Sequence, residues 1–157
     1  MTIGIAAILA SLALPSFVAG MRSNRVSTAA NVVLSTINFA RSEALRSKDT
    51  AHICPGSDGS ACGTDWNQGL TVWTDENRSG ALDANEIRRV VEPQRGVILS
   101  ASDAASGVTF DNRGRLGAGT APVFTVRADV CATGAQNQRA ISINFIGRAT
   151  VARQECS

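Results

Sequence analysis

The opening segment of this chain, Met1–Met21, contains no charged side chain, and this feature limits the fold more than any other. As a helix the segment would extend roughly 30 Å, about the thickness of the hydrocarbon core of a bilayer. Gly4 and the alanines that follow it offer small-residue surfaces on which another helix packs closely. We therefore expect residues 1–21 to form a helix segment that spans a membrane or fills the core of a filament.

Two other interpretations of this segment are a cleavable signal and a buried core helix. A cleavable secretory signal needs a cationic stretch ahead of its apolar core, and here the apolar core begins at the first residue. An ordinary buried core helix is the second alternative. Pro15 and the near absence of polar residues disfavour it.

From Ser23 the pattern becomes that of an amphipathic helix. Its apolar residues recur at spacings of three and four: Val26, Ala30, Val33, Ile37, Ala40, Ala44 and Leu45. One long helix is thus predicted from near the start to about Lys48. Its second half, residues 22–48, is expected to pack on a sheet.

Beyond Asp49 the sequence is rich in Gly, Asp, Asn, Ser and Pro, and the apolar runs shorten to strand length. Strands are predicted at residues 50–54, 70–74, 87–91, 97–100, 108–111, 123–128, 140–145 and 149–152. A helix followed by a run of antiparallel strands predicts an α+β fold, with a β-rich head over residues 49–157.

The four cysteines fall into two groups, Cys54 with Cys62 and Cys131 with Cys156. None belongs to a CxxC pair, and His52 is the only histidine, so the pattern favours disulfides over a zinc site. We expect the bonds within each group, although three pairings are formally open. Disulfides indicate an oxidising compartment such as a periplasm or a cell surface.

The formal net charge is only +2, but residues 112–157 carry six arginines against Asp129 and Glu155, a local charge of 6 − 2 = +4. Arginines that could contact DNA phosphates are Arg113, Arg115, Arg139, Arg148 and Arg153. The alternative is a mildly basic, soluble surface. It is supported by the lack of aromatic residues between these arginines other than Phe124 and Phe145, which alternate with polar neighbours and are expected in the core. Core packing is also favoured for Trp73, whereas Trp66 could be a core residue or an interface anchor.

The segment DENRSGALDANE, Asp75–Glu86, matches a twelve-residue EF-hand loop. The candidate calcium ligands are Asp75, Asn77, Ser79, Asp83 and Glu86. The preceding LTVWT is strand-like rather than helical, so we favour a solvated turn held by Asx-type hydrogen bonds, with calcium as the alternative.

No other metal or cofactor is expected. His52 has no evident nucleophile partner, so we do not expect an enzyme.

Taken together, these segments resemble the pseudopilins and minor pilins of the GspH/FimT type. TIGIAAILASLALPSF is similar to the helix that follows the prepilin peptidase site, with Pro15 at the family's proline. The family's methylated phenylalanine and nearby glutamate are not in this sequence, which suggests N-terminal truncation. NFARSEALR resembles the ARSEA signature, and QGLTVWTDENRSG resembles the family's Gly-Trp hairpin stretch. VTFDNRGRLG and ISINFIGRATVAR resemble two late strand pairs that end in Gly-Arg.

The resemblance implies a structural subunit of a type IV pilus that contacts other pilins through its helix and head. Before assembly such a subunit sits in the inner membrane with a periplasmic head; afterwards it belongs to a pilus or pseudopilus, which can reach the cell surface. Minor pilins of this kind help to start assembly at the tip. Two alternatives follow: a GspH-type pseudopilin of type II secretion, and a FimT-like DNA-binding pilin for natural transformation. The latter uses Gly-Arg-x-Arg, matched here only by Gly147 and Arg148, so Arg153 would have to replace the second arginine.

Overall fold

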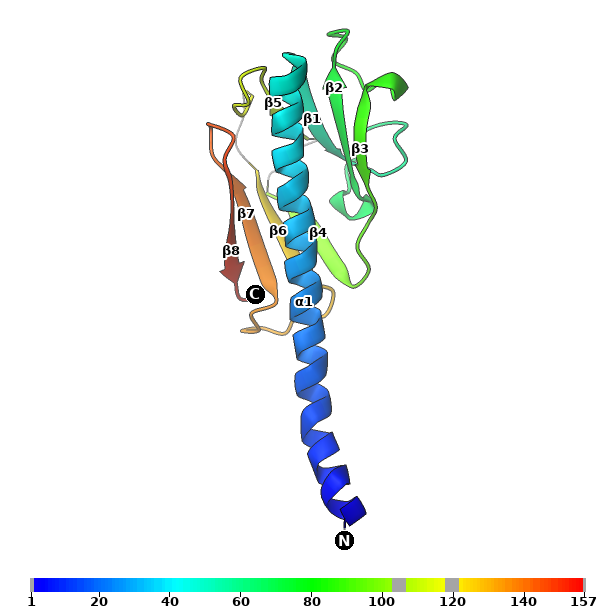
Figure 1. The fold of residues 1–157 in the computed structure, drawn as a ribbon, viewed down its shortest axis with the longest axis vertical. Helices are drawn as coiled ribbons and strands as arrows, with labels where there is room; N and C mark the ends of the chain where they lie inside the picture. Colours follow the sequence, from blue (N-terminus) through cyan, green and yellow to red (C-terminus); the bar gives the residue numbers. More distant parts are fainter. Residues whose placement is uncertain (1, 103–106, 118–121, 157) are drawn as a thin grey trace.

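The computed structural model describes residues 2–102, 107–117 and 122–156, with side chains from residue 17 onward. One long helix, α1 (Thr2–Ser47), leads into a head of antiparallel strands and projects well beyond it (Figure 1). The predicted α+β class with a long N-terminal helix is confirmed. The side chains of residues 1–16, where most of the expected membrane or filament segment falls, lie outside the described residues. Over the part of the chain that is described, no helix is both long and apolar enough to cross a membrane.

The head contains two four-stranded sheets, with strand orders β3-β2-β1-β5 and β4-β6-β7-β8, and every neighbouring pair is antiparallel. The strands are β1 (Thr50–Pro55), β2 (Leu70–Asp75), β3 (Ile87–Val91), β4 (Val97–Ala101), β5 (Val108–Phe110), β6 (Val123–Ala128), β7 (Gln138–Ile143) and β8 (Ala149–Gln154). Two short 3-10 helices, η1 (Trp66–Gln68) and η2 (Ala84–Glu86), lie in the connections before β2 and β3. All eight predicted strands are therefore present.

The second half of α1 packs along both sheets (Figure 1). Its buried face repeats at three and four residues, as predicted: Val26, Ala29, Ala30, Val33, Ile37, Ala40 and Ala44. Alanines dominate this face, so the helix backbone approaches the strands closely. The prediction that Leu45 belongs to this buried face is wrong, because its side chain is 49% exposed.

The two sheets meet in one apolar core beneath the helix. Trp66 lies in it and packs edge-to-face on Phe124 of β6, with ring centroids 4.9 Å apart. The carboxylate of Asp65 caps η1 by accepting the Asn67 N–H at 2.9 Å, which fixes Trp66 in place. Trp73 is also buried, so both tryptophans serve packing within the head.

The last hairpin departs from the sequence prediction. The strand expected at residues 140–145 begins and ends two residues earlier, at Gln138–Ile143. Asn144 and the three residues after it form a tight turn, closed by the Gly147 N–H donating to the Asn144 carbonyl at 2.8 Å. The expectation that Phe145 is a core residue is therefore wrong, since its side chain lies on this turn and is 77% exposed.

Candidate functional site

Arg41 of α1 holds together two turns that lie far apart in the sequence. Its Nε donates to the carbonyl oxygen of Gly114 at 2.9 Å, and it lies against Gly147 of the other turn. A Cβ added to Gly147 would fall 2.1 Å from the Gly114 carbonyl oxygen, so the two backbones are in direct contact. The hydrogen bond from the Leu116 N–H to the Phe145 carbonyl, at 3.0 Å, ties the same two segments together.

Each turn is built by an acidic or amide side chain that accepts backbone N–H groups. Asp111 accepts from Arg113 at 2.9 Å and from Arg115 at 2.8 Å, and the Arg115 guanidinium also bonds to it. Burial alone would raise the pKa of Asp111, but these hydrogen bonds and the Arg115 charge outweigh it and lower the pKa. Asn144 plays the same part in the second turn, accepting from the Arg148 N–H at 2.9 Å.

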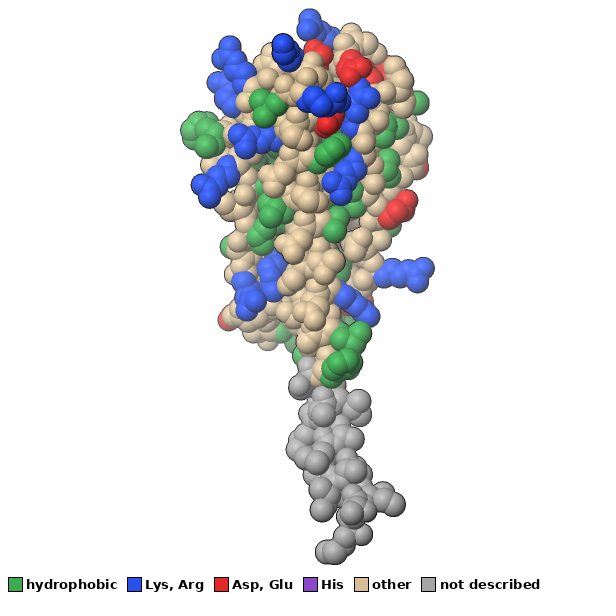
Figure 2. Space-filling model, viewed as in Figure 1, with side chains coloured by type: hydrophobic (Ala, Val, Ile, Leu, Met, Phe, Trp, Pro, Cys, Tyr) green, Lys and Arg blue, Asp and Glu red, His purple; other side chains and the backbone are tan. Residues whose placement is uncertain are grey.

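The contact between the turns creates a surface at the end of the head away from the projecting helix. We call it the tip surface and define it by Arg113, Arg115, Phe145, Ile146 and Arg148, all of them exposed. Figure 2 shows Lys and Arg side chains gathered over this end of the head. An exposed aromatic residue beside several arginines is the composition favoured at protein–protein contacts and also at nucleic-acid contacts.

Arg139 does not join this surface. Its side chain is buried and donates to the carbonyl oxygens of Gln136 and Gln138 at 3.0 and 2.8 Å and to the Ser27 hydroxyl at 3.1 Å. Burial lowers the pKa of Arg139, and the neighbouring Arg153 lowers it further. The guanidinium therefore fastens α1 to the second sheet. Arg153, opposite Arg139 in the β7–β8 register, is exposed.

A second surface lies where α1 leaves the head. Phe17, Val18 and Met21 are 67%, 45% and 42% exposed, whereas the first helix residue buried by the head is Val26. These three side chains belong to the last part of the uncharged segment, residues 1–21. We call them the helix-exit surface. Apolar side chains exposed next to one another are a feature of sites that contact another protein or a membrane.

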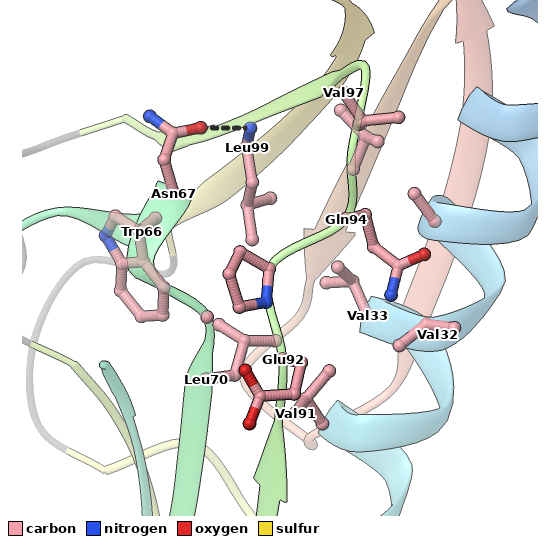
Figure 3. A pocket seen from close by; sticks show the side chains of 14 residues that line it. Val32, Val33, Trp66, Asn67, Leu70, Val91, Glu92, Gln94, Val97 and Leu99 are labelled. Atoms are coloured by element: carbon pink, nitrogen blue, oxygen red, sulfur yellow. Dashed lines mark hydrogen bonds between the residues drawn. The ribbon is translucent and has the colours of Figure 1, made fainter. Parts of the chain in front are cut away.

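The apolar pocket between η1 and α1 is too small for a ligand. It lies where the β3–β4 connection passes from one sheet to the other, and it is lined mainly by apolar side chains, including Val33, Trp66 and Leu99 (Figure 3). Its volume is about 30 Å³, which is room for a single water. Asn67 bridges its rim by accepting the Leu99 N–H at 2.9 Å. The pocket is a packing gap.

The described residues show no arrangement typical of catalysis around His52. Its ring stacks on Trp73 with centroids 4.1 Å apart, and its nitrogens lie 2.9 Å from the Thr109 hydroxyl and 3.2 Å from the Thr50 hydroxyl. Burial lowers the pKa of His52, although the negative charges of Asp75 and Glu86 partly oppose this. The histidine is a packed residue of the outer sheet face.

Within the described residues, no three His, Cys, Asp or Glu side chains form a group able to hold a metal ion. The calcium-loop candidates form a turn with Asx-type hydrogen bonds. The Ser79 N–H donates to Asp75 at 2.9 Å and to Asn77 at 2.8 Å. Asn77 in turn donates to the Asp83 carboxylate at 2.7 Å.

Both cysteine groups are bonded internally. Cys54–Cys62 closes a short loop over the outer face of the first sheet, with Cα atoms 5.4 Å apart. Cys131–Cys156 ties the end of the chain to the loop between β6 and β7, with Cα atoms 5.7 Å apart.

A long helix laid across a head of two antiparallel sheets, with a projecting apolar end, is the architecture of type IV pilin-like subunits. The family model described as "Type II transport protein GspH" matches residues 29–147. The chain therefore belongs to the GspH/FimT family of minor pilins and pseudopilins.

Solved structures agree with this assignment at the level of the fold. One crystal structure of the type IV minor pilin FimU of Pseudomonas aeruginosa PAO1 matches with a TM-score of 0.66 and 21% identity, covering 82% of this chain and 89% of that one. A second crystal form of FimU matches with a TM-score of 0.62 and 23% identity, covering 80% and 91%. No curated protein is significantly similar in sequence.

The sequence did not reveal the role of Arg41, although it lies within the ARSEA motif. Its partners stand 73 and 106 positions further along the chain, and no local pattern signals such a contact. The exposed Phe145 and Ile146 were also missed, because an apolar pair directly after an alternating strand is indistinguishable from the strand's continuation.

Proposed function

We propose that this chain is a minor pilin or pseudopilin that joins its neighbours through helix segment 1–21 and docks them through its head. The observation that supports this is the helix-exit surface: Phe17, Val18 and Met21 stay exposed on a helix that the head no longer covers. Their apolar area is stabilised when lipid or neighbouring helices exclude water from it. The inner membrane before assembly and a filament core afterwards provide these two environments.

The proposal is tested with the full chain and two arginine variants of α1. Phe17→Arg/Val18→Arg places charge on the helix-exit surface, and Asn24→Arg is the matched control, because Asn24 is already polar and exposed. We measure flotation with lipid vesicles and the sedimentation of detergent-free protein. Wild type and Asn24→Arg should float with vesicles or self-associate, and the double variant should lose most of this behaviour. A wild-type chain that stays monomeric in water and does not float would overturn the proposal.

A pilus component and a type II secretion pseudopilin share this fold and differ in the subunits around them. Co-purification with the pilins of each assembly, each expressed beside this chain, separates the two. We propose the pilus as the first assignment, because the solved structures that match over four-fifths of the chain are of a pilus minor pilin.

A second candidate function, DNA binding, is favoured by the way the fold gathers Arg113 and Arg148 at the tip surface. Arg153 lies about 17 Å further along β8, five residues at strand spacing. Arg115 is partly neutralised by its ion pair with Asp111. We propose that a duplex would follow β8 from the tip surface and contact Arg148 and Arg153 through phosphates.

This candidate is tested by the mobility shift of duplex DNA with the full chain in detergent, at two salt concentrations. Arg148→Gln/Arg153→Gln should weaken binding and lower the log–log salt slope by about 2. Arg95→Gln, an exposed arginine in the β3–β4 connection, is the control and should weaken binding less. Absence of a shift at low salt would refute DNA binding while leaving the pilin proposal intact.

A further inference from the structure

The connection between β2 and β3 contains two buried carboxylates. Asp75, the last residue of β2, is 7% exposed, and Glu86, directly before β3, is 1% exposed. A carboxylate removed from water is costly unless hydrogen-bond donors or a cation occupy its oxygens. The partners of these four oxygens therefore show what the loop is built to hold.

Three of the four oxygens have backbone partners. Asp75 accepts the N–H groups of Ser79 at 2.9 Å and of Gly80 at 3.0 Å, one on each oxygen. Oε1 of Glu86 accepts the N–H groups of Glu76 at 2.9 Å and of Asn77 at 3.1 Å. These bonds wrap the loop around the two acids.

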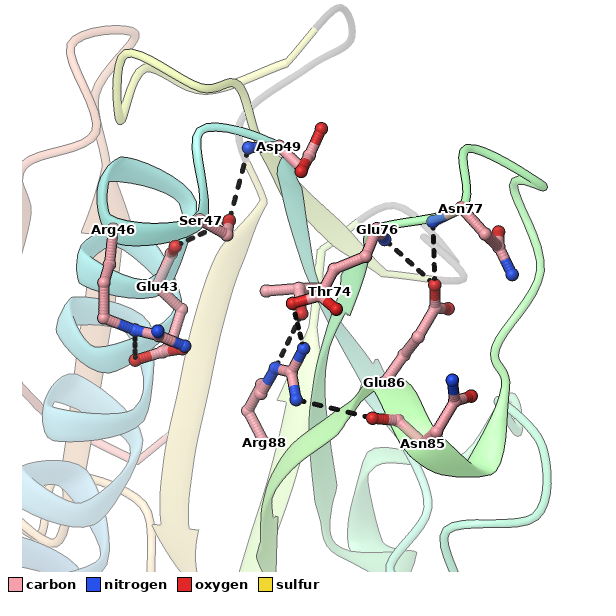
Figure 4. Close-up of polar contacts among 10 residues, drawn as sticks. All are labelled: Glu43, Arg46, Ser47, Asp49, Thr74, Glu76, Asn77, Asn85, Glu86 and Arg88. Carbon is pink, nitrogen blue, oxygen red and sulfur yellow. Dashed lines mark hydrogen bonds and ion pairs between the residues drawn. The ribbon is translucent and has the colours of Figure 1, made fainter.

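The fourth oxygen, Oε2 of Glu86, is buried and has no hydrogen-bond partner among the described residues. Figure 4 shows the carboxylate inside the loop, with the Asn77 side chain turned toward the same space. Arg88 of β3 does not serve it, because Arg88 donates to Thr74 at 2.7 Å and pairs with Glu76. A buried carboxylate oxygen that faces a polar loop and has no donor there is a position that a cation can fill.

We propose that this loop is a calcium site. Its oxygen-bearing side chains occupy positions one, three, five, nine and twelve of a twelve-residue loop: Asp75, Asn77, Ser79, Asp83 and Glu86. Gly80, at the sixth position, has φ +73°, the sharp turn that such a loop needs. All donors are hard oxygens in a loop of flexible geometry. This suits Ca²⁺ better than Mg²⁺, which demands strict octahedral geometry.

The absence of a three-member acidic cluster among the described residues fits this ligand set. Asp75 and Glu86 are buried in the loop, whereas Asp83 is exposed and accepts from the amide of Asn77 at 2.7 Å. In loops of this kind the ninth position commonly acts through a water, and neutral amide, hydroxyl and carbonyl oxygens complete the shell. Rotation of the Asn77 amide would present its oxygen to the ion and release Asp83.

The full chain in detergent micelles is titrated with CaCl₂ by isothermal titration calorimetry, and its thermal unfolding is recorded in CaCl₂, MgCl₂ and chelator. We expect one Ca²⁺ per chain with a dissociation constant on the order of 10⁻⁴ to 10⁻³ M, the class of extracellular modules. Calcium should raise the unfolding temperature, and magnesium at the same concentration should not.

Glu86→Gln keeps an oxygen for the two backbone N–H groups but removes the charge, so calcium affinity should fall at least tenfold. The matched control is Glu76→Gln, the same substitution at an exposed acid that faces Arg88, and it should bind as wild type does. Asp83→Asn, at an exposed position, provides a second variant should Glu86→Gln not fold, and it should weaken binding severalfold.

Two results would overturn the site. One is no heat and no thermal shift up to ~10 mM CaCl₂, well above the expected dissociation constant. The other is wild-type affinity in both Glu86→Gln and Asp83→Asn, which would place the ion elsewhere. An equal thermal shift with magnesium would overturn the assignment to calcium.

Discussion

The guanidinium of Arg41, six residues before α1 ends at Ser47, donates to the carbonyl oxygen of Gly114 at 2.9 Å. Gly114 and Gly147 both have positive φ, +70° and +79°, and Arg41 lies over both. Two Gly-Arg turns that are separate in the sequence are thus fixed to one side chain of the helix. The helix that is proposed to enter a filament is in this way in direct contact with the two turns that carry the tip surface.

Replacing Arg41 by alanine should lower the free energy of unfolding by about 2 kcal/mol, because the buried Gly114 carbonyl loses its partner. Urea unfolding followed by tryptophan fluorescence measures the change. Arg25→Ala is the control: Arg25 is an exposed arginine of the same helix that makes no side-chain hydrogen bond within the described residues. Its substitution should change stability by no more than about 0.5 kcal/mol. Similar losses in both variants would mean that the Arg41 contact is not stabilising.

The contact between the two turns can be tested with a pair of glycines. Gly147→Ala would place a Cβ 2.1 Å from the Gly114 carbonyl oxygen, whereas Gly134→Ala, with φ +80°, meets no atom within 4 Å. The Gly134 substitution should cost only the left-handed backbone conformation, about 1 kcal/mol. The Gly147 substitution adds a steric clash and should cost more than about 3 kcal/mol. Equal losses in urea unfolding would show that the turns separate easily.

The elements that follow from local pattern could be predicted from the sequence. The three-and-four repeat from Val26 to Ala44 and the alternation within the strands mark the residues that become buried. The sequence therefore predicts the helix, the presence of each strand and the fold class, although the strand expected at residues 140–145 lies two residues earlier. Close spacing within each cysteine group likewise favoured the pairs that the structure contains.

Features that depend on long-range geometry could not be predicted in this way. Arg139 looks like any other surface arginine in the sequence, but its guanidinium is used to fasten β7 to Ser27 of the helix. Phe145 continues the apolar alternation of β7, and only the Asn144 turn places it outside. In both cases a tertiary contact overrides a local preference.

The single histidine gives the chain a simple pH dependence near neutrality. Burial lowers the pKa of His52 from its ordinary 6.5. Above pH 6.5 both folded and unfolded chains hold it neutral, so its contribution to stability is complete there. As pH falls from 6.5 toward the lowered value, the unfolded chain binds the proton first and stability is lost.

We therefore expect wild type to lose stability as the pH falls below 6.5, and His52→Gln to lose less over the same range. Urea unfolding at each pH measures this difference. NMR titration of the single imidazole provides the direct check. A midpoint at or above 6.5 in the folded chain would contradict the burial effect.

The two disulfides should stabilise the head unequally, since they close loops of different length. Sequence separations of 8 for Cys54–Cys62 and 25 for Cys131–Cys156 correspond to about 2.5 and about 3.5 kcal/mol when the constraint acts on the unfolded chain. Cys131→Ala/Cys156→Ala should therefore cost about 1 kcal/mol more than Cys54→Ala/Cys62→Ala in urea unfolding.

The longer bridge also holds the segment after β8, where the N–H of Cys156 donates to the carbonyl oxygen of Ala135 at 2.9 Å. Its loss should speed amide exchange in β8, which carries Arg153, while β1 and β2 remain protected. Faster exchange in β1 instead, or a larger cost for the shorter bridge, would show that packing around Cys54 outweighs loop length.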